Sequence, residues 1–264
     1  MNGIKLEAEE LAYLLATVDA PGLIGVDDPK LVPSTAKSRD TTFSKGRKQL
    51  EAHGWVQEIS GKPGEYDLNA GLFHTVAVMA APEMVVATSR GVAEEDRQLV
   101  VHYLVREHIV ELWATSEKSY FLARLPDRTV LNERMAELLG LAIEAQEGKF
   151  MLSESTFNKA KNLAQKEQLA QAEKLLATAG VNGRTGKSLL AALASPVRGQ
   201  VVVTRANAGE IEAGRRAELF GEKKGAWVAV RLEADSKELQ LSPVGADELA
   251  ALVRGWLEEL GRSA

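Results

Sequence analysis

The strongest chemical pattern in the chain is the stretch Gly180-Val181-Asn182-Gly183-Arg184-Thr185-Gly186-Lys187-Ser188. A loop that ends in Gly-Lys-Ser can wrap a phosphate in backbone amides, provided that a glycine lies five positions earlier and that a strand leads into the loop. Here that earlier position is Val181, and the residues upstream form an expected helix that ends at Ala179. We therefore interpret the stretch as a helix closed by glycine and followed by the next helix, and we exclude nucleotide hydrolysis.

No other residues form a catalytic or metal-binding pattern. The four histidines (His53, His74, His102 and His108) lack metal-ligand spacing, cysteine is absent, and no Gly-x-Ser-x-Gly elbow occurs. We predict a protein that is not an enzyme and that holds no metal or cofactor. An enzyme whose site the sequence does not reveal stays as a third alternative.

A basic run offers a second kind of chemistry, which is contact with phosphates. Its residues are Lys37, Arg39, Lys45, Arg47 and Lys48. Lys45, Arg47 and Lys48 lie in an expected helix over 44–53, and Lys37 and Arg39 lie in the polar stretch before it. An expected helix over 6–18 comes earlier, and a hairpin over 55–68 with a Gly-Lys-Pro-Gly tip follows, which is the order of a winged helix-turn-helix. Gly46 inside the second helix and three glutamates near the first argue against DNA binding, so a solvated basic face on a protein-binding module is the other interpretation.

The elements that follow this region occur twice. In both copies a tryptophan follows a proline by 31 positions, from Pro82 to Trp113 and from Pro196 to Trp227. Each copy is expected to contain an apolar helix, four short strands and a closing helix. The strands are expected at 81–88, 97–101, 110–114 and 120–122 in the first copy, and at 201–204, 215–219, 226–230 and 239–241 in the second.

The predicted fold class is α+β, with two duplicated α/β halves related by a pseudo-twofold axis. Each half has a helical, winged-helix-like preface and a four-stranded antiparallel sheet. The N-terminal half covers 1–142, with its preface at 1–68 and its sheet and helices at 69–142. The C-terminal half covers 150–264, with its preface at 150–185, a lost or shortened wing, and its sheet and helices at 186–264.

Bulk properties limit the classes of function. The chain has 264 residues, 45% of them hydrophobic, a net charge of −5 and no apolar run long enough to cross a membrane. The absence of cysteine favours a reducing cytoplasm. The acidic balance argues weakly against nucleic-acid partners, and the chain is expected to be a monomer or homodimer without membrane contact.

The layout resembles the EspG-type cytosolic chaperones of type VII (ESX) secretion. The residues that carry this resemblance are Leu189 to Pro196, Gln200 to Arg205, the loop Ala206-Asn207-Ala208-Gly209, the strand Trp227 to Arg231 and the helix Glu248 to Leu260. The resemblance implies a non-enzymatic protein that shields the apolar tip of a helical secretion substrate, and the usual partners in that family are PE–PPE heterodimers.

We therefore predict a protein-binding module, most concretely a cytosolic chaperone for a helical secreted protein or protein pair. The loops at 91–96 and 207–214 and the hairpin at 222–225 are expected to offer contact surface. The predicted partner-binding residues are Trp113, Trp227, Arg205 and Arg215, with core packing as the other interpretation of both tryptophans. The alternative is a winged-helix transcription regulator that binds DNA through the basic run.

Overall fold

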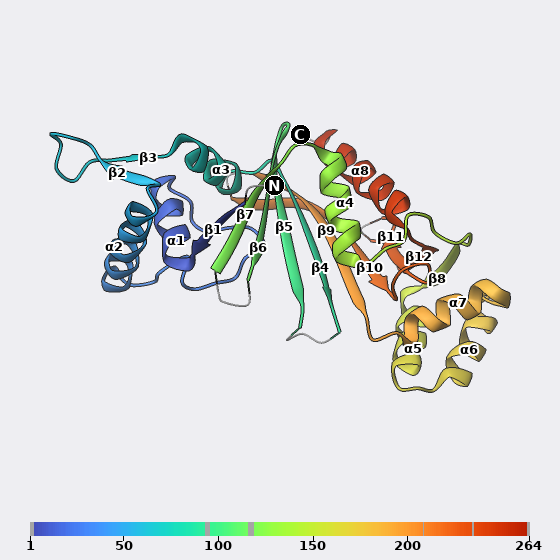
Figure 1. Ribbon diagram of the computed structural model, residues 1–264. Coiled ribbons are helices and arrows are strands. Elements are labelled where there is room, and N and C mark those ends of the chain that lie inside the picture. The colour runs from blue at the N-terminus through green and yellow to red at the C-terminus, as the bar shows by residue number, and fades with distance from the viewer. Residues whose placement is uncertain (1–2, 93–95, 116–118, 208, 234, 263–264) are drawn as a thin grey trace. The chain divides into compact units, whose positions relative to one another are not determined.

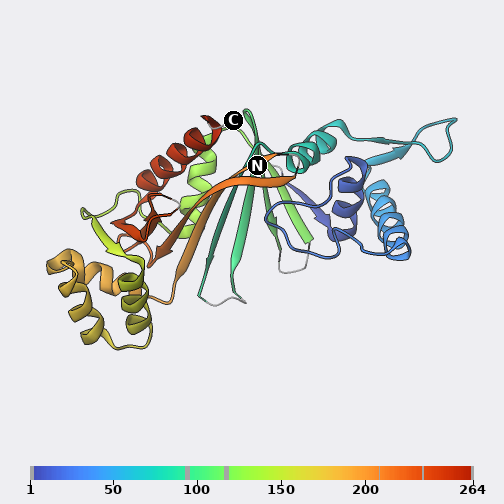
Figure 2. The ribbon, with the colours of Figure 1, turned by 180° about the vertical axis from the view of Figure 1, so that it is seen from behind.

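The computed structural model describes residues 3–92, 96–115, 119–207, 209–233 and 235–262 (Figures 1 and 2). Within these ranges the chain forms eight helices and twelve strands. Ten strands are hydrogen-bonded in the order β1-β7-β6-β5-β4-β9-β10-β11-β12-β8, and β2 and β3 form a separate hairpin. The predicted α+β class is confirmed, and the ten strands form one large antiparallel sheet where a four-stranded sheet in each half was expected.

The chain divides into two compact units. Unit 1 comprises Met1–Val86, Val100–Arg128 and Thr204–Ala213, and unit 2 comprises Ala87–Leu99, Thr129–Val203 and Gly214–Ala264. These units differ from two consecutive halves, because β4, β5, β9 and β10 each contribute residues to both units.

Unit 1 contains a helical layer and most of the first set of strands. Its helices and strands are β1 (Ile4–Glu7), α1 (Ala8–Thr17), α2 (Ala36–Ala52), β2 (Val56–Glu58), β3 (Tyr66–Leu68), α3 (Ala70–Ala80), the start of β4 (Met84–Gly91), most of β5 (Gln98–Val105), β6 (His108–Ala114) and β7 (Ser119–Leu125). The hairpin predicted over 55–68 is present as β2 and β3, which pair antiparallel.

Buried polar contacts join the elements of unit 1. The backbone N–H of Glu7 donates to Glu10 Oε2 at 2.7 Å, and the other oxygen of this fully buried carboxylate lies 2.8 Å from His53 Nδ1 at the end of α2. On β5 and β6, the cross-strand neighbours His102 and Glu111 are both buried and lie 2.9 Å apart. Paired in this way, each buried polar side chain avoids part of the desolvation cost of an unpaired one.

Two tyrosines fix the long connection between α1 and α2 onto the sheet. The Tyr103 hydroxyl donates to the carbonyl of Ile24 at 2.9 Å, and the Tyr120 hydroxyl donates to Asp28 Oδ2 at 2.6 Å. Burial raises the pKa of Tyr103 well above its ordinary value, and burial followed by the Asp28 hydrogen bond does the same for Tyr120. Both hydroxyls therefore stay protonated and keep donating at any physiological pH.

Unit 2 contains a three-helix bundle on one face of its strands. Its elements are α4 (Arg128–Leu139), β8 (Phe150–Ser153), α5 (Glu154–Gln165), α6 (Leu169–Thr178), α7 (Gly183–Ala194), most of β9 (Arg198–Asn207) and of β10 (Glu210–Phe220), β11 (Trp227–Arg231), β12 (Glu238–Pro243) and α8 (Ala246–Arg262). Ser153 is the N-cap of α5, because its Oγ accepts from the backbone N–H of Thr156. Phe157 of α5 packs on Phe220 of β10 with ring centroids 5.4 Å apart, so this face of the sheet belongs to the bundle.

Two sequence predictions about the strands are corrected. Each set of four strands gains a fifth, β1 beside β7 and β8 beside β12. The end of β1 overlaps the helix expected over 6–18, and β8 lies in the preface that was expected to be helical. The expected loop over 207–214 is instead largely the start of β10, which begins at Glu210. The contact loop predicted at 91–96 falls partly on residues 93–95, which lie outside the described residues.

The equal spacing from proline to tryptophan does not give equivalent positions. Trp113 lies near the end of β6, whereas Trp227 is the first residue of β11. The strands between the proline and the tryptophan are longer after Pro196, with ten and eleven residues in β9 and β10 against eight each in β4 and β5. Each tryptophan thus lies in the third strand after its proline, but at opposite ends of these strands.

Candidate functional site

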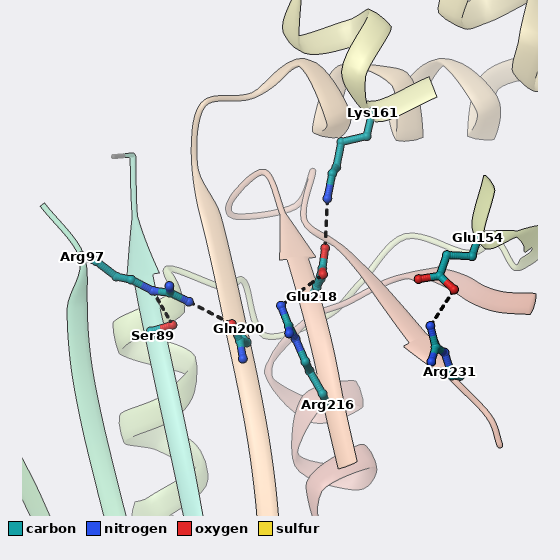
Figure 3. A network of polar contacts seen from close by, with 8 residues as sticks. All are labelled: Ser89, Arg97, Glu154, Lys161, Gln200, Arg216, Glu218 and Arg231. Carbon is teal, nitrogen blue, oxygen red and sulfur yellow. Dashed lines mark hydrogen bonds and ion pairs between the residues drawn. The ribbon is translucent and has the colours of Figure 1, made fainter. Parts of the chain in front are cut away.

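A strip of polar side chains crosses the strands of unit 2 on the face that carries the bundle (Figure 3). Arg97 donates from Nε to Ser89 Oγ at 3.0 Å and from Nη2 to Gln200 Oε1 at 2.9 Å. Alternation along a strand places these side chains on a common face of the sheet, so that they reach each other across neighbouring strands.

The strip continues across β10 to helix α5. Glu218 accepts from Lys161 Nζ at 3.2 Å and from Arg216 at 3.3 Å, and Arg231 donates to Glu154 at 2.6 Å (Figure 3). We call these residues the polar strip: Ser89, Arg97, Glu154, Lys161, Gln200, Arg216, Glu218 and Arg231. It carries four cations and two carboxylates, so it favours contact with acidic or polar groups.

Near the polar strip, α5, α6 and α7 border a hollow of about 800 Å³. Val92, which is 61% exposed, and Leu169, which is 44% exposed, both line it, together with Pro196. Large apolar side chains this exposed, gathered in one concave place, are typical of a protein contact site.

The hollow also has a charged rim. It is formed by Glu167 and Arg198. Two guanidinium nitrogens of Arg198 donate to the backbone carbonyls of Leu193, Ser195 and Val197, which lie at and beyond the end of α7. Burial lowers the pKa of Arg198 from its ordinary value, with a smaller opposite effect of Glu218, and an arginine stays charged under such a shift. Arg198 therefore shapes the rim and holds the C-terminus of α7.

The four predicted partner-binding residues do not form one site. Trp227 is fully buried, donates from Nε1 to Ser188 Oγ at 3.2 Å, and stacks on Phe150, so it is a core residue and not a contact residue. Trp113 is half-buried and packs on Phe121 with centroids 4.3 Å apart. Core packing, the other interpretation of the tryptophans, therefore describes Trp227.

The two predicted partner-binding arginines are engaged in ion pairs. Arg205 in unit 1 pairs with Glu212 at 2.8 Å, and Arg215 in unit 2 pairs with Glu259 of α8. Trp227 pairs with Phe220 of β10, so their side chains lie on the same face of the sheet. Arg215 is an odd number of residues before Phe220 along β10, and side chains alternate between faces along a strand. Arg215 and Trp227 therefore lie on different faces.

The predicted DNA-binding residues lie on α2, and several have partners inside the protein. Lys45 donates to Glu9 at 2.7 Å, and this hydrogen bond is the main cause that lowers the pKa of Glu9. Arg47 lies 3.4 Å from Glu51 and over the ring of Tyr66. Lys37, Arg39 and Lys48 are exposed.

The helical arrangement around α2 differs from a helix-turn-helix. Residues 18–35 connect α1 to α2, whereas that motif uses a turn of about three or four residues. Gly46 marks the crossing of the two helices, since a Cβ built there lies only 2.0 Å from the backbone oxygen of Glu9. This glycine thus permits close helix packing.

The glycine-rich stretch at 180–188 has the structure expected for it. Helix α6 precedes it and α7 begins at Gly183, so Lys187 and Ser188 lie within a helix. Among the described residues, no group of three or more His, Asp or Glu side chains is placed to hold a metal ion. No helix in the same described ranges is both long enough and apolar enough to span a bilayer.

Sequence reasoning missed the hollow. Its lining comes from Val92, from 164–169 and from 194–198, which are far apart in the chain. The only local signal was an apolar valine after Gly91 at the end of a strand.

Comparison with known proteins defines the class of fold. No protein-family model and no curated protein matches the sequence. Among solved structures, the chain has the fold of a type VII secretion chaperone. The matching structure is EspG5 of Mycobacterium tuberculosis in complex with a PE25–PPE41 dimer, with a TM-score of 0.68 and 14% identity over 97% of this chain and 96% of that one. The resemblance predicted from the layout is confirmed at the level of the fold.

Proposed function

We propose that this protein is a non-enzymatic cytoplasmic chaperone that binds a helical protein and covers an apolar part of it before type VII secretion. The observation that carries the proposal is the hollow, where Val92 and Leu169 are exposed beside a polar strip. The similar fold of EspG5, solved with a PE25–PPE41 dimer, supports a helical protein as the partner.

The chemistry of the surface matches a helix tip. Apolar side chains at the end of a helical hairpin can enter the hollow and remove Val92, Leu169 and Pro196 from water. The charged groups around it are suited to select partner and register, because exposed ion pairs contribute more to specificity than to affinity. The hollow therefore supplies the apolar contact, while its charged rim and the neighbouring polar strip supply the polar contacts.

We also infer that the two halves arose from one ancestral unit. In both, the order is a strand, two helices, a further helix, four strands and a closing helix, with the β2–β3 hairpin present in the first half alone among the described residues. Superposition of experimental coordinates for 70–139 on 183–262 is expected to match strand for strand. A mismatch in strand order or direction would contradict a common origin.

The DNA-binding alternative is not proposed, since α2 lacks a short turn before it and Lys45 and Arg47 are paired within the protein. We expect duplex DNA to bind at most weakly, and the triple variant Arg39→Ala/Arg47→Ala/Lys48→Ala to leave that binding unchanged within about twofold. Fluorescence anisotropy at several salt concentrations tests this. Tight binding that falls steeply with salt and is lost in the variant would support the regulator instead.

The test of the proposed function uses helical secreted proteins encoded beside this gene, co-expressed with the full chain. Leu169→Asp or Val92→Asp is expected to weaken the complex at least about tenfold, because a carboxylate enters an apolar contact. Ile143→Asp is the matched control, since Ile143 is 73% exposed and outside the hollow. Isothermal titration calorimetry measures each affinity.

Two results would contradict the proposed function. One is that none of the helical neighbours binds the wild-type chain. The other is that the hollow variants bind as tightly as Ile143→Asp does.

A further inference from the structure

The helical bundle of unit 2 is basic, as α2 is, although the protein as a whole is acidic. Residues 154–194, which form α5, α6 and α7, carry six lysines and arginines against three glutamates, whereas the whole chain has a net charge of −5. Two charged residues of α5 form ion pairs with residues of the sheet, Lys161 with Glu218 and Glu154 with Arg231. The remaining excess of positive charge lies on other faces of the bundle.

A groove between α5 and α6 collects part of this charge. It encloses about 650 Å³ and is lined by three lysines, Lys159, Lys166 and Lys174, with no carboxylate among its lining residues. Lys166 is the C-cap of α5 and follows Lys159 by seven residues, so the two lie about two turns apart on the same side of the helix. In the described part of the chain, none of the three lysines has an ion-pair partner, and all three are exposed.

The rest of the groove adds hydrogen-bonding groups and an apolar floor. Leu163 and Leu175 are half-buried and pack on the core of the bundle. The groove also includes Gln168, the N-cap of α6, whose side chain does not cap the helix. The N-terminus of a helix favours a nearby negative charge, so the helix dipole acts in the same direction as the lysines.

We infer that this groove binds an acidic segment of the protein partner, with apolar side chains on Leu163 and Leu175 and carboxylates between the three lysines. The inference rests on the proposed function and deepens it, because it states the chemistry of a second contact apart from the hollow. A segment with glutamates and leucines at helical spacing fits the groove, since both its charges and its apolar face are complementary to the lining.

The test uses the full chain and a short fluorescent peptide in which glutamates and leucines repeat at helical spacing. Fluorescence anisotropy at low salt is expected to show saturable binding. The triple variant Lys159→Gln/Lys166→Gln/Lys174→Gln is expected to bind about tenfold more weakly, because three exposed charge pairs are lost. Added salt is expected to weaken the wild-type complex as well.

A matched control separates the groove from net charge. The variant Arg184→Gln/Lys187→Gln/Lys224→Gln removes the same charge from exposed residues outside the groove, and it is expected to bind like the wild type. Circular dichroism melting confirms that both triple variants fold, since all six positions are exposed.

Several outcomes would overturn the inference. One is that the groove variant and the control variant weaken peptide binding by the same factor. Another is that a peptide with glutamine in place of glutamate binds as tightly as the acidic peptide. A third is that duplex DNA binds as tightly as the peptide and that the groove variant abolishes this binding. Peptide binding does not require the hollow. If the acidic peptide does not bind but the helical partner does, the inference about the groove is refuted and the proposed function is not. If the peptide binds but no helical partner does, the proposed function is refuted.

Discussion

Replacing Trp227 by alanine is expected to lower the free energy of unfolding by about 3–5 kcal/mol. The indole is fully buried and lies in one apolar cluster with Phe157 and Phe220. It also stacks on Phe150, with ring centroids 5.9 Å apart, and donates to Ser188. Alanine would leave a cavity between the sheet and α7 and would remove the donor to Ser188. Urea unfolding followed by circular dichroism measures the loss.

Trp113→Ala is the matched comparison, because Trp113 lies in the corresponding strand but is half-buried. Its loss is expected to be about 1–2 kcal/mol, mainly from the contact with Phe121. Equal losses at the two positions would show that the two tryptophans have equivalent environments, which contradicts the difference in burial described above.

Replacing Gly46 by alanine is expected to destabilise the protein by about 3 kcal/mol, although alanine is the better helix former. The added Cβ would meet the carbonyl oxygen of Glu9 at 2.0 Å and its carbon at 2.6 Å. These are backbone atoms of α1, so no side-chain rotation relieves the clash. Helix α2 must instead move away from α1, which disturbs the Lys45–Glu9 hydrogen bond.

Gly255→Ala is the control for Gly46→Ala. Gly255 lies inside α8, and a Cβ there meets no atom within 4 Å. The variant is expected to be more stable by about 1 kcal/mol, through helix propensity alone. Thermal and urea unfolding of the two variants side by side is the measurement. A gain in stability at both positions would mean that α1 and α2 do not cross closely at Gly46.

Much of the local structure could be predicted because its signals are local. Alternating apolar residues and turn residues predicted most of the strands that follow Pro82 and Pro196. The strands β1 and β8 were missed because each has four residues and runs directly into a helix. Four residues show too little apolar and polar alternation to indicate a strand, and the helical periodicity of the residues that follow extends the predicted helix over them.

The burial of the tryptophans could not be predicted from spacing. The spacing is the same from Pro82 to Trp113 and from Pro196 to Trp227, yet the longer strands that follow Pro196 place Trp227 at the start of its strand instead of near the end. Burial then depends on which helices cover that end. The helix over 183–194 covers Trp227, and Ser188 accepts its hydrogen bond.

The sequence by itself determined the α+β class, the order of the elements apart from β1 and β8, the likeness to type VII secretion chaperones and the absence of a recognisable catalytic motif. Periodicity, turn residues and caps act between residues close in the chain, so these features are readable without a structure. Only the tertiary structure decided where Val92, Leu169 and Pro196 meet, and that the lysines of α5 and α6 share a groove. Such surfaces join segments far apart in sequence, and their geometry depends on packing that no local pattern encodes.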